Sequence, residues 1–192
     1  MPNIFDHSHD QAIPLQELEV HFRSPEAGWV HIRIIPLHEL YAIHCSYIWD
    51  PLPDMIAWLE QIAGGDTDAV WFVDQEGDAS RLQFYAARDR TDGPGDFLLH
   101  IQTDDHGITR IRGVRVDRRQ LVEAFYRAFR AMTEHADYRP REWEMHPDFA
   151  TLDDLDDEAY CREHSRFPYG GANLRDLKST LLEAYLAGAN ES

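Results

Sequence analysis

The sequence is short of thiols, of lysine and of long apolar runs. It has two cysteines, Cys45 and Cys161, and Lys178 is the one lysine among its 18 Lys and Arg residues. Two widely separated thiols do not make a disulfide framework, so we expect both to be reduced and buried. No apolar run approaches the roughly 18 residues of a membrane-spanning helix. The first ten residues lack the basic start and apolar stretch of a signal peptide. We therefore expect a cytoplasmic protein.

Recognisable catalytic and cofactor motifs are also missing. The sequence has no P-loop, no G-x-G-x-x-G, no G-x-S-x-G, no C-x₂-C and no H-E-x-x-H. His44 and Cys45 are adjacent on a predicted strand and point to opposite faces, so they cannot bind one ion. Cys161 and His164 share one helix face at most, whereas zinc needs three or four ligands on rigid elements. We expect no metal, no organic cofactor and no catalytic residue, which favours a binding role over an enzymatic one.

Negative charge dominates the composition. The chain has 18 Lys and Arg residues against 35 Asp and Glu residues, a formal net charge of −17 over 192 residues. Such an excess repels DNA, RNA and anionic lipid, because binding to these depends on basic residues that neutralise phosphates. It suits a basic protein partner. We therefore predict a basic protein partner, no nucleic acid and no membrane.

Two local clusters refine this charge pattern. The acidic cluster opens a predicted helix and consists of Asp153, Asp154, Asp156, Asp157 and Glu158. We interpret it as a contact surface for a cationic partner; the alternative is a solvated first helical turn, where acidic residues are favoured. The basic cluster lies around the last predicted strand and consists of Arg110, Arg112, Arg115, Arg118 and Arg119. We expect these arginines to pair internally with carboxylates. The alternative is an anion-binding stripe at Arg110, Arg112 and Arg115.

Alternating apolar residues predict a strand-rich first part of the chain. The predicted strands share a two-residue period and short connections rich in Gly, Pro and Asp. They cover residues 17–22, 30–34, 40–48, 69–74, 81–87, 96–103 and 108–116. A change of apolar phase at Gly113 predicts a β-bulge in the last of them. The short connections favour antiparallel pairing over parallel crossovers.

Helical periodicity predicts three main helices, over residues 51–63, 117–134 and 174–187. Each begins beside a residue that favours a helix N-terminus: Asp50, Asp117 and Asn173. Strands over 17–116, interrupted by one helix, and helices over 117–188 predict a single α+β domain spanning residues 1–192. We expect an antiparallel meander sheet of six or seven strands with helices packed on one face.

One stretch resembles a known class of proteins. It runs from Tyr47 to Leu59 as Y-I-W-D-P-L-P-D-M-I-A-W-L, continues to Gly64-Gly65, and includes Val70–Gly77 with its D-Q-E-G turn. It is similar to uncharacterised bacterial proteins in which a "D-P-hydrophobic-D-hydrophobic" helix separates two halves of an antiparallel sheet. Some of them accompany secreted polymorphic toxins and are assigned as immunity proteins. The resemblance covers residues 17–130, rests on a helix cap and a hairpin turn, and transfers no catalytic residue.

The resemblance and the charge together suggest a function. They imply a non-enzymatic acidic binding protein, of immunity or inhibitor type, that neutralises a basic protein partner such as a toxin. The alternative is an enzyme or small-ligand-binding protein that uses a cleft between the sheet and the helices. Residues 136–172 have no counterpart in the resemblance, and their role is not predicted.

Overall fold

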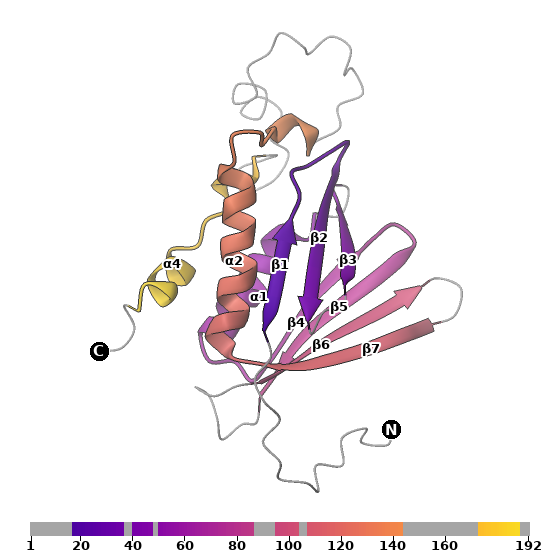
Figure 1. Cartoon of the computed structure of the whole chain (residues 1–192), viewed down its shortest axis with the longest axis vertical. Coiled ribbons are helices and arrows are strands. Elements are labelled where there is room, and N and C mark those ends of the chain that lie inside the picture. Colours follow the sequence, from indigo (N-terminus) through magenta and orange to yellow (C-terminus); the bar gives the residue numbers. More distant parts are fainter. Residues whose placement is uncertain are drawn as a thin grey trace, which may run out of the picture.

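The computed structural model describes residues 17–36, 40–47, 50–86, 95–103, 107–143 and 173–188. Within these ranges the strands form two antiparallel sheets (Figure 1), in the orders β1-β2-β3 and β4-β5-β6-β7. The strands are β1 (Leu18–Phe22), β2 (Trp29–Pro36), β3 (Tyr41–Ser46), β4 (Asp68–Asp74), β5 (Asp78–Tyr85), β6 (Gly95–Thr103) and β7 (Gly107–Val116). The helices are α1 (Leu52–Ala63), α2 (Arg118–Glu134) and α4 (Thr180–Leu186), with short 3-10 helices η1 (Pro140–Glu142) and η3 (Leu174–Asp176). None of these helices has the length and apolar character needed to span a membrane.

The α+β class and the antiparallel pairing are confirmed, but the single meander sheet is wrong. A three-stranded sheet and a four-stranded sheet take its place, and α1 lies between them in the chain. The reason is the wide apolar stripe of α1, which buries Leu52, Met55, Ile56, Trp58, Leu59 and Ile62. A stripe of that width needs cover from more than one side. Each sheet therefore buries one face against the helices and keeps the other face open.

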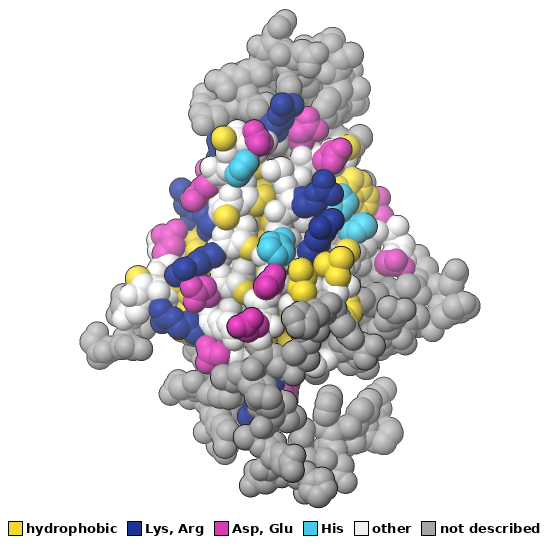
Figure 2. Space-filling view, viewed as in Figure 1, with side chains coloured by type: hydrophobic (Ala, Val, Ile, Leu, Met, Phe, Trp, Pro, Cys, Tyr) yellow, Lys and Arg dark blue, Asp and Glu magenta, His cyan; other side chains and the backbone are white. Residues whose placement is uncertain are grey.

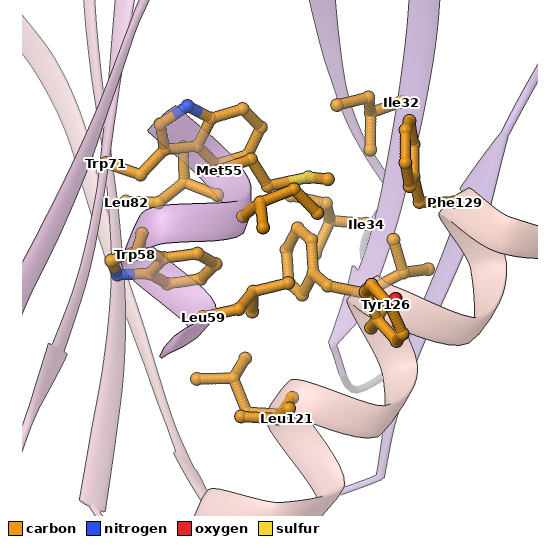
Figure 3. Close-up of a cluster of buried hydrophobic side chains, with 14 of the residues drawn as sticks. Ile32, Ile34, Met55, Trp58, Leu59, Trp71, Leu82, Leu121, Tyr126 and Phe129 are labelled. Atoms are coloured by element: carbon orange, nitrogen blue, oxygen red, sulfur yellow. The ribbon is translucent and has the colours of Figure 1, made fainter. Parts of the chain in front are cut away.

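Both sheets and both long helices contribute to one hydrophobic core (Figure 3). Trp58 of α1 stacks on Trp71 of β4, with ring centroids 5.8 Å apart. Phe125 of α2 meets Trp58 edge-on at 5.3 Å. Figure 3 shows Trp58 and Trp71 at one side of the side-chain cluster and Ile32 and Ile34 of β2 toward the other. Aromatic pairs in these geometries stabilise the core beyond the burial of their surface. Side chains of α1 contact both sheets, so this helix connects them through the core.

A carboxylate accepts a backbone N–H at the start of each long helix. Asp117 is the N-cap of α2, as predicted, whereas Pro51 occupies the N-cap position of α1 and Asp50 precedes it. The Asp50 carboxylate accepts a hydrogen bond from the Leu52 backbone N–H at 2.9 Å. The Asp117 carboxylate accepts one from the Gln120 N–H at 3.0 Å. Such caps satisfy backbone donors that a helix cannot satisfy itself. These two contacts position α1 and α2 on the core.

The continuous last helix over 174–187 is wrong. Asn173 caps only the short η3, accepting from the Arg175 N–H at 3.1 Å. The chain then leaves helical geometry, and Ser179 caps α4 by accepting from the Leu182 N–H at 3.1 Å. The Ser179 hydroxyl accepts a backbone N–H that would otherwise bond within a continuous helix. A serine in this role begins a new helix at its position. Figure 1 shows α4 on the side of α2 away from β1.

The β-bulge in β7 lies elsewhere than predicted. The register shift falls between Ile101 and Gln102, whose partners in β7 are Arg110 and Ile108. The extra residue is therefore Thr109. Gly113 pairs regularly with Leu98, so the change of apolar phase at that glycine is not produced by an inserted residue.

The turn between β4 and β5 ties the two sheets together at one end. Gln75 accepts a hydrogen bond from the His44 backbone N–H through its Oε1 at 2.7 Å. The Ser46 hydroxyl donates to the Glu76 carboxylate. Gly77 has a φ of +130°, a conformation that glycine adopts without strain. The predicted turn role of Asp74 and Glu76 is confirmed, because the Glu76 N–H donates to the Asp74 carboxylate at 2.9 Å.

Candidate interaction surface

Three large apolar side chains lie exposed together on the open face of the four-stranded sheet. Val70 and Phe72 of β4 are 40% and 57% exposed, and Tyr85 of β5 is 51% exposed. Val70 pairs with Gln83, so Tyr85 is its diagonal neighbour, while Phe72 lies two residues along the same strand. Side chains at these positions are close enough to form one surface. We call Val70, Phe72 and Tyr85 the apolar patch.

The sequence of β4 builds this patch. Between Asp68 and Asp74 the strand reads A-V-W-F-V, with no polar residue on either face. Ala69, Trp71 and Val73 enter the core, whereas Val70 and Phe72 point the other way and stay exposed. An apolar strand of this kind is typical of a strand that is covered on both faces. Exposed apolar patches on a protein mark surfaces that contact another molecule.

Charged residues surround the apolar patch. Asp68 and Asp74 lie at the two ends of β4, and Asp96 of β6 is the cross-strand neighbour of Tyr85. Two arginines share this face: Arg81 opposite Phe72, and Arg115 opposite Asp96. An apolar centre with a charged margin is the usual composition of a protein-binding surface.

The structure places only part of the residues that the sequence singles out. The acidic cluster of Asp153, Asp154, Asp156, Asp157 and Glu158 lies outside the described residues, as do Cys161 and His164. The backbones of Arg110 and Arg112 pair with Ile101 and Leu99, and their side chains are outside the described part. Arg115 has the carboxylate residue Asp96 as its cross-strand neighbour.

Arg118 and Arg119 are held inside the fold, but by backbone carbonyl groups. Arg118 is 4% exposed and donates through Nη1 to the carbonyl oxygens of Ile62 and Asp66, the second at 2.9 Å. Arg119 donates to the carbonyl oxygens of Tyr185 and Leu186 at 3.1 and 2.5 Å. The last carbonyl groups of a helix have no partner within the helix and attract cations. These arginines therefore bind carbonyl groups at the C-terminal ends of α1 and α4, whereas the sequence predicts that they pair with carboxylates.

Asp50 and Cys45 form a titratable pair inside the fold. Burial raises the pKa of Asp50 to about 6, and the hydrogen bond from the Leu52 N–H opposes this shift. The Trp143 indole also lowers that pKa, although its N–H does not reach good hydrogen-bond geometry. Burial, and secondarily Asp50, raises the pKa of the Cys45 thiol well above its ordinary value. A protonated, fully buried thiol is not a nucleophile. The Asp50 carboxylate accepts the Leu52 N–H at the start of α1.

The sequence of β4 also indicates the apolar patch, through apolar residues at positions where an alternating strand would have polar ones. The run of five apolar residues in β4 departs from strict alternation, and this departure identifies a strand with two apolar faces. The roles of Arg118 and Arg119 carry no such signal, because carbonyl groups distant in the chain are their partners.

Comparisons with known proteins add little to this surface. No family model matches the chain, and no curated protein is similar to it. Among solved structures, the chain is similar to the plant transcriptional regulator PBF-2, with 15% identity over 60% of this chain and 74% of the other. The TM-score is 0.36. So low a score supports neither a shared fold nor a shared function.

Proposed function

We propose that this protein is a non-enzymatic binding protein, of immunity or inhibitor type, that neutralises a basic protein partner. The apolar patch is the contact surface in this proposal. The observation that supports it best is the exposure of Phe72 and Tyr85, at 57% and 51%, on one open sheet face. Aromatic side chains at the centre of an interface contribute most of its binding energy.

The charge of the chain supports a basic partner. A net charge of −17 attracts a cationic protein over long distances and speeds its association. Around the patch, Asp68, Asp74 and Asp96 outnumber Arg81 and Arg115. The acidic cluster Asp153–Glu158 belongs to the proposal through its charge alone, as a region that steers the partner.

Affinity capture with matched variants tests the proposal. The full chain and the double variant Phe72→Ser/Tyr85→Ser serve as baits in a lysate of the source organism. Leu40→Ser is the control, because Leu40 is 59% exposed and lies beside the other sheet. We expect a basic protein that binds the wild type and the control, and binds the double variant about 100-fold more weakly. An acidic partner, or equal binding to all three baits, would reject the proposal.

Kinetics separate the two parts of this surface. Changing the acidic cluster to Asn and Gln should slow association and reduce its salt dependence, because exposed charges act mainly on encounter. The Phe72→Ser/Tyr85→Ser variant should instead speed dissociation, because buried contacts set residence time. If the acidic-cluster variant leaves both the association rate and the salt dependence unchanged, that cluster does not steer the partner.

A further inference from the structure

The open face of the three-stranded sheet carries a group of cationic and titratable side chains. The cross-strand neighbours on this face are Arg23, His31 and His44 in one row, and His21 and Arg33 in the next. The backbone N–H of Arg23 donates to the carbonyl oxygen of His31 at 3.0 Å, which fixes the first row. We call His21, Arg23, His31, Arg33 and His44 the cationic patch.

The alternation of the strands exposes this patch. Val20, Ile32 and Cys45 enter the core, so residues at the odd positions of β1 and β2 and the even positions of β3 face outward. Figure 2 looks onto this face and shows dark-blue and cyan side chains gathered over β2 and β3. Neighbouring strands lie about 4.8 Å apart, and same-face residues along a strand lie about 6.7 Å apart. An anion with several oxygens spans two or three of these side chains.

The charges around His31 differ from those of the chain as a whole, which is strongly negative. The imidazole rings of His31 and His44 meet edge-on, with centroids 4.7 Å apart. Burial lowers the pKa of His31, and His44, Arg23 and Arg33 lower it further, while Glu26 raises it. On β1, the Glu19 Oε2 atom lies 3.5 Å from the Nε2 atom of His21. The cations closest to His31 therefore outweigh Glu26.

An anion fits these surroundings better than a metal ion. His31 and His44 have no third His, Cys, Asp or Glu ligand grouped with them among the described residues. The guanidinium groups of Arg23 and Arg33 repel a metal cation, whereas they match the oxygens of phosphate and sulfate groups. An extended polyanion is repelled by the net charge of −17. A small anion experiences mainly the local field.

We propose that the cationic patch binds a small multivalent oxyanion, of the sulfate or phosphate-ester class, and that binding strengthens as the pH falls. Histidine is the side-chain type whose charge changes between about pH 5 and pH 8, and histidines lie beside the two fixed arginine charges of this patch. A bound anion favours the protonated form of a neighbouring imidazole such as that of His31, and by linkage protonation of that imidazole strengthens anion binding. This inference is independent of the apolar patch.

Imidazole chemical shifts of the isotope-labelled full chain test the proposal. The probe is sodium sulfate, which does not titrate in this range, at pH 5.5 and pH 7.5 with ionic strength held constant by sodium chloride. We expect saturable shifts at His31 and His44, with a dissociation constant about tenfold lower at pH 5.5. His135 is the internal control, since it is exposed in the turn after α2 and its neighbouring charge is the carboxylate of Asp137, 3.5 Å away. Equal shifts at His135 and His31, or equal affinity at the two pH values, would overturn the proposal.

Two further measurements identify the residues and the source of the anion. Arg23→Gln and Arg33→Gln should each weaken sulfate binding about fivefold or more. Arg127→Gln is the matched control, because Arg127 is an exposed arginine on α2 that pairs with Glu123 at 2.8 Å. Vesicles of phosphatidylglycerol are the alternative source. Co-sedimentation with vesicles, without saturable sulfate binding, would replace the small anion by a membrane surface and overturn the proposal.

Discussion

The open faces of the two sheets follow the same alternation but carry different chemistry. The face of the three-stranded sheet has arginines and histidines in adjacent rows, as at Arg23 and His31. The face of the four-stranded sheet has Phe72 and Tyr85, each more than half exposed. A net charge of −17 describes neither face. Surface chemistry is therefore set strand by strand, and the two faces favour different ligands.

The largest expected effect is a difference in the free energy of unfolding between substitutions on the buried face and on the open face of β4. Trp71 is 1% exposed, stacks on Trp58 and donates its indole N–H to the Pro51 carbonyl oxygen at 2.9 Å. Its neighbour Phe72 is 57% exposed. We expect Trp71→Ala to lower the free energy of unfolding by about 3 to 5 kcal/mol and Phe72→Ala by less than about 1 kcal/mol. Urea unfolding followed by circular dichroism measures both.

A milder variant keeps this comparison measurable if Trp71→Ala does not fold. Trp71→Phe retains an aromatic ring but loses the indole hydrogen bond, and it should cost about 1 to 3 kcal/mol. A cost for Phe72→Ala as large as that for Trp71→Phe would show that Phe72 is packed rather than exposed, and would contradict the open face.

The second effect concerns the junction between the sheets, where Asp50 precedes α1. Because its pKa rises from 3.8 to about 6 on folding, the folded state binds more protons than the unfolded state between these pH values. Stability from this group is therefore present below pH 3.8 and is lost as the pH rises through 6. Asp50→Asn keeps the acceptor for the Leu52 N–H and removes the charge. We expect it to raise the free energy of unfolding by up to about 3 kcal/mol at pH 7.5, and to change it little at pH 4.

The control for this experiment is Asp54→Asn. Asp54 is exposed in the first turn of α1, where a negative charge is favoured. Its loss should change the stability at pH 7.5 by less than about 1 kcal/mol, because the favourable position at the helix start is offset by the repulsion between Asp54 and Asp50. If Asp50→Asn destabilises the protein at pH 7.5, the carboxyl group is not held in an unfavourable charged state.

The smallest effect concerns the link between the sheets at Gln75. This side chain accepts from the His44 N–H at 2.7 Å and donates to the Ser80 hydroxyl at 2.9 Å. Gln75→Ala should lower the free energy of unfolding by about 1 kcal/mol and speed hydrogen exchange at the His44 amide. Gln83→Ala is the control, since Gln83 bonds Asp68 on an exposed face. Unchanged exchange at His44 would show that the link does not protect the edge of β3.

Much of the fold could be predicted because it depends on local patterns. Alternation predicts the seven strands found within the described residues, and Asp50 and Asp117 mark the starts of α1 and α2. The division into two sheets could not be predicted in this way. Periodicity identifies a buried face but not the strands that pair beyond a helix. The wide apolar stripe of α1 was the available signal.

The candidate surfaces were harder to predict than the fold. Single residues such as Phe72 look like core residues in the sequence, since exposure depends on what covers the outer face of β4. The histidines of the cationic patch are far apart in the chain, and only the register of β1, β2 and β3 makes them neighbours. The acidic cluster at Asp153–Glu158 stays a prediction from charge.

The link at Gln75 also bears on how copies of this chain meet each other. A strand at the edge of a sheet offers backbone N–H groups to any passing strand, and this is how ordered aggregates grow. On the outer edge of β3 the His44 N–H is already bonded to Gln75 of the other sheet. The Ser46 hydroxyl beside it is bonded to Glu76, whose charge would oppose an approaching backbone carbonyl. The side chains of Gln75 and Glu76 therefore also block the edge of β3, so that a strand of a second copy cannot pair with it and start an ordered aggregate.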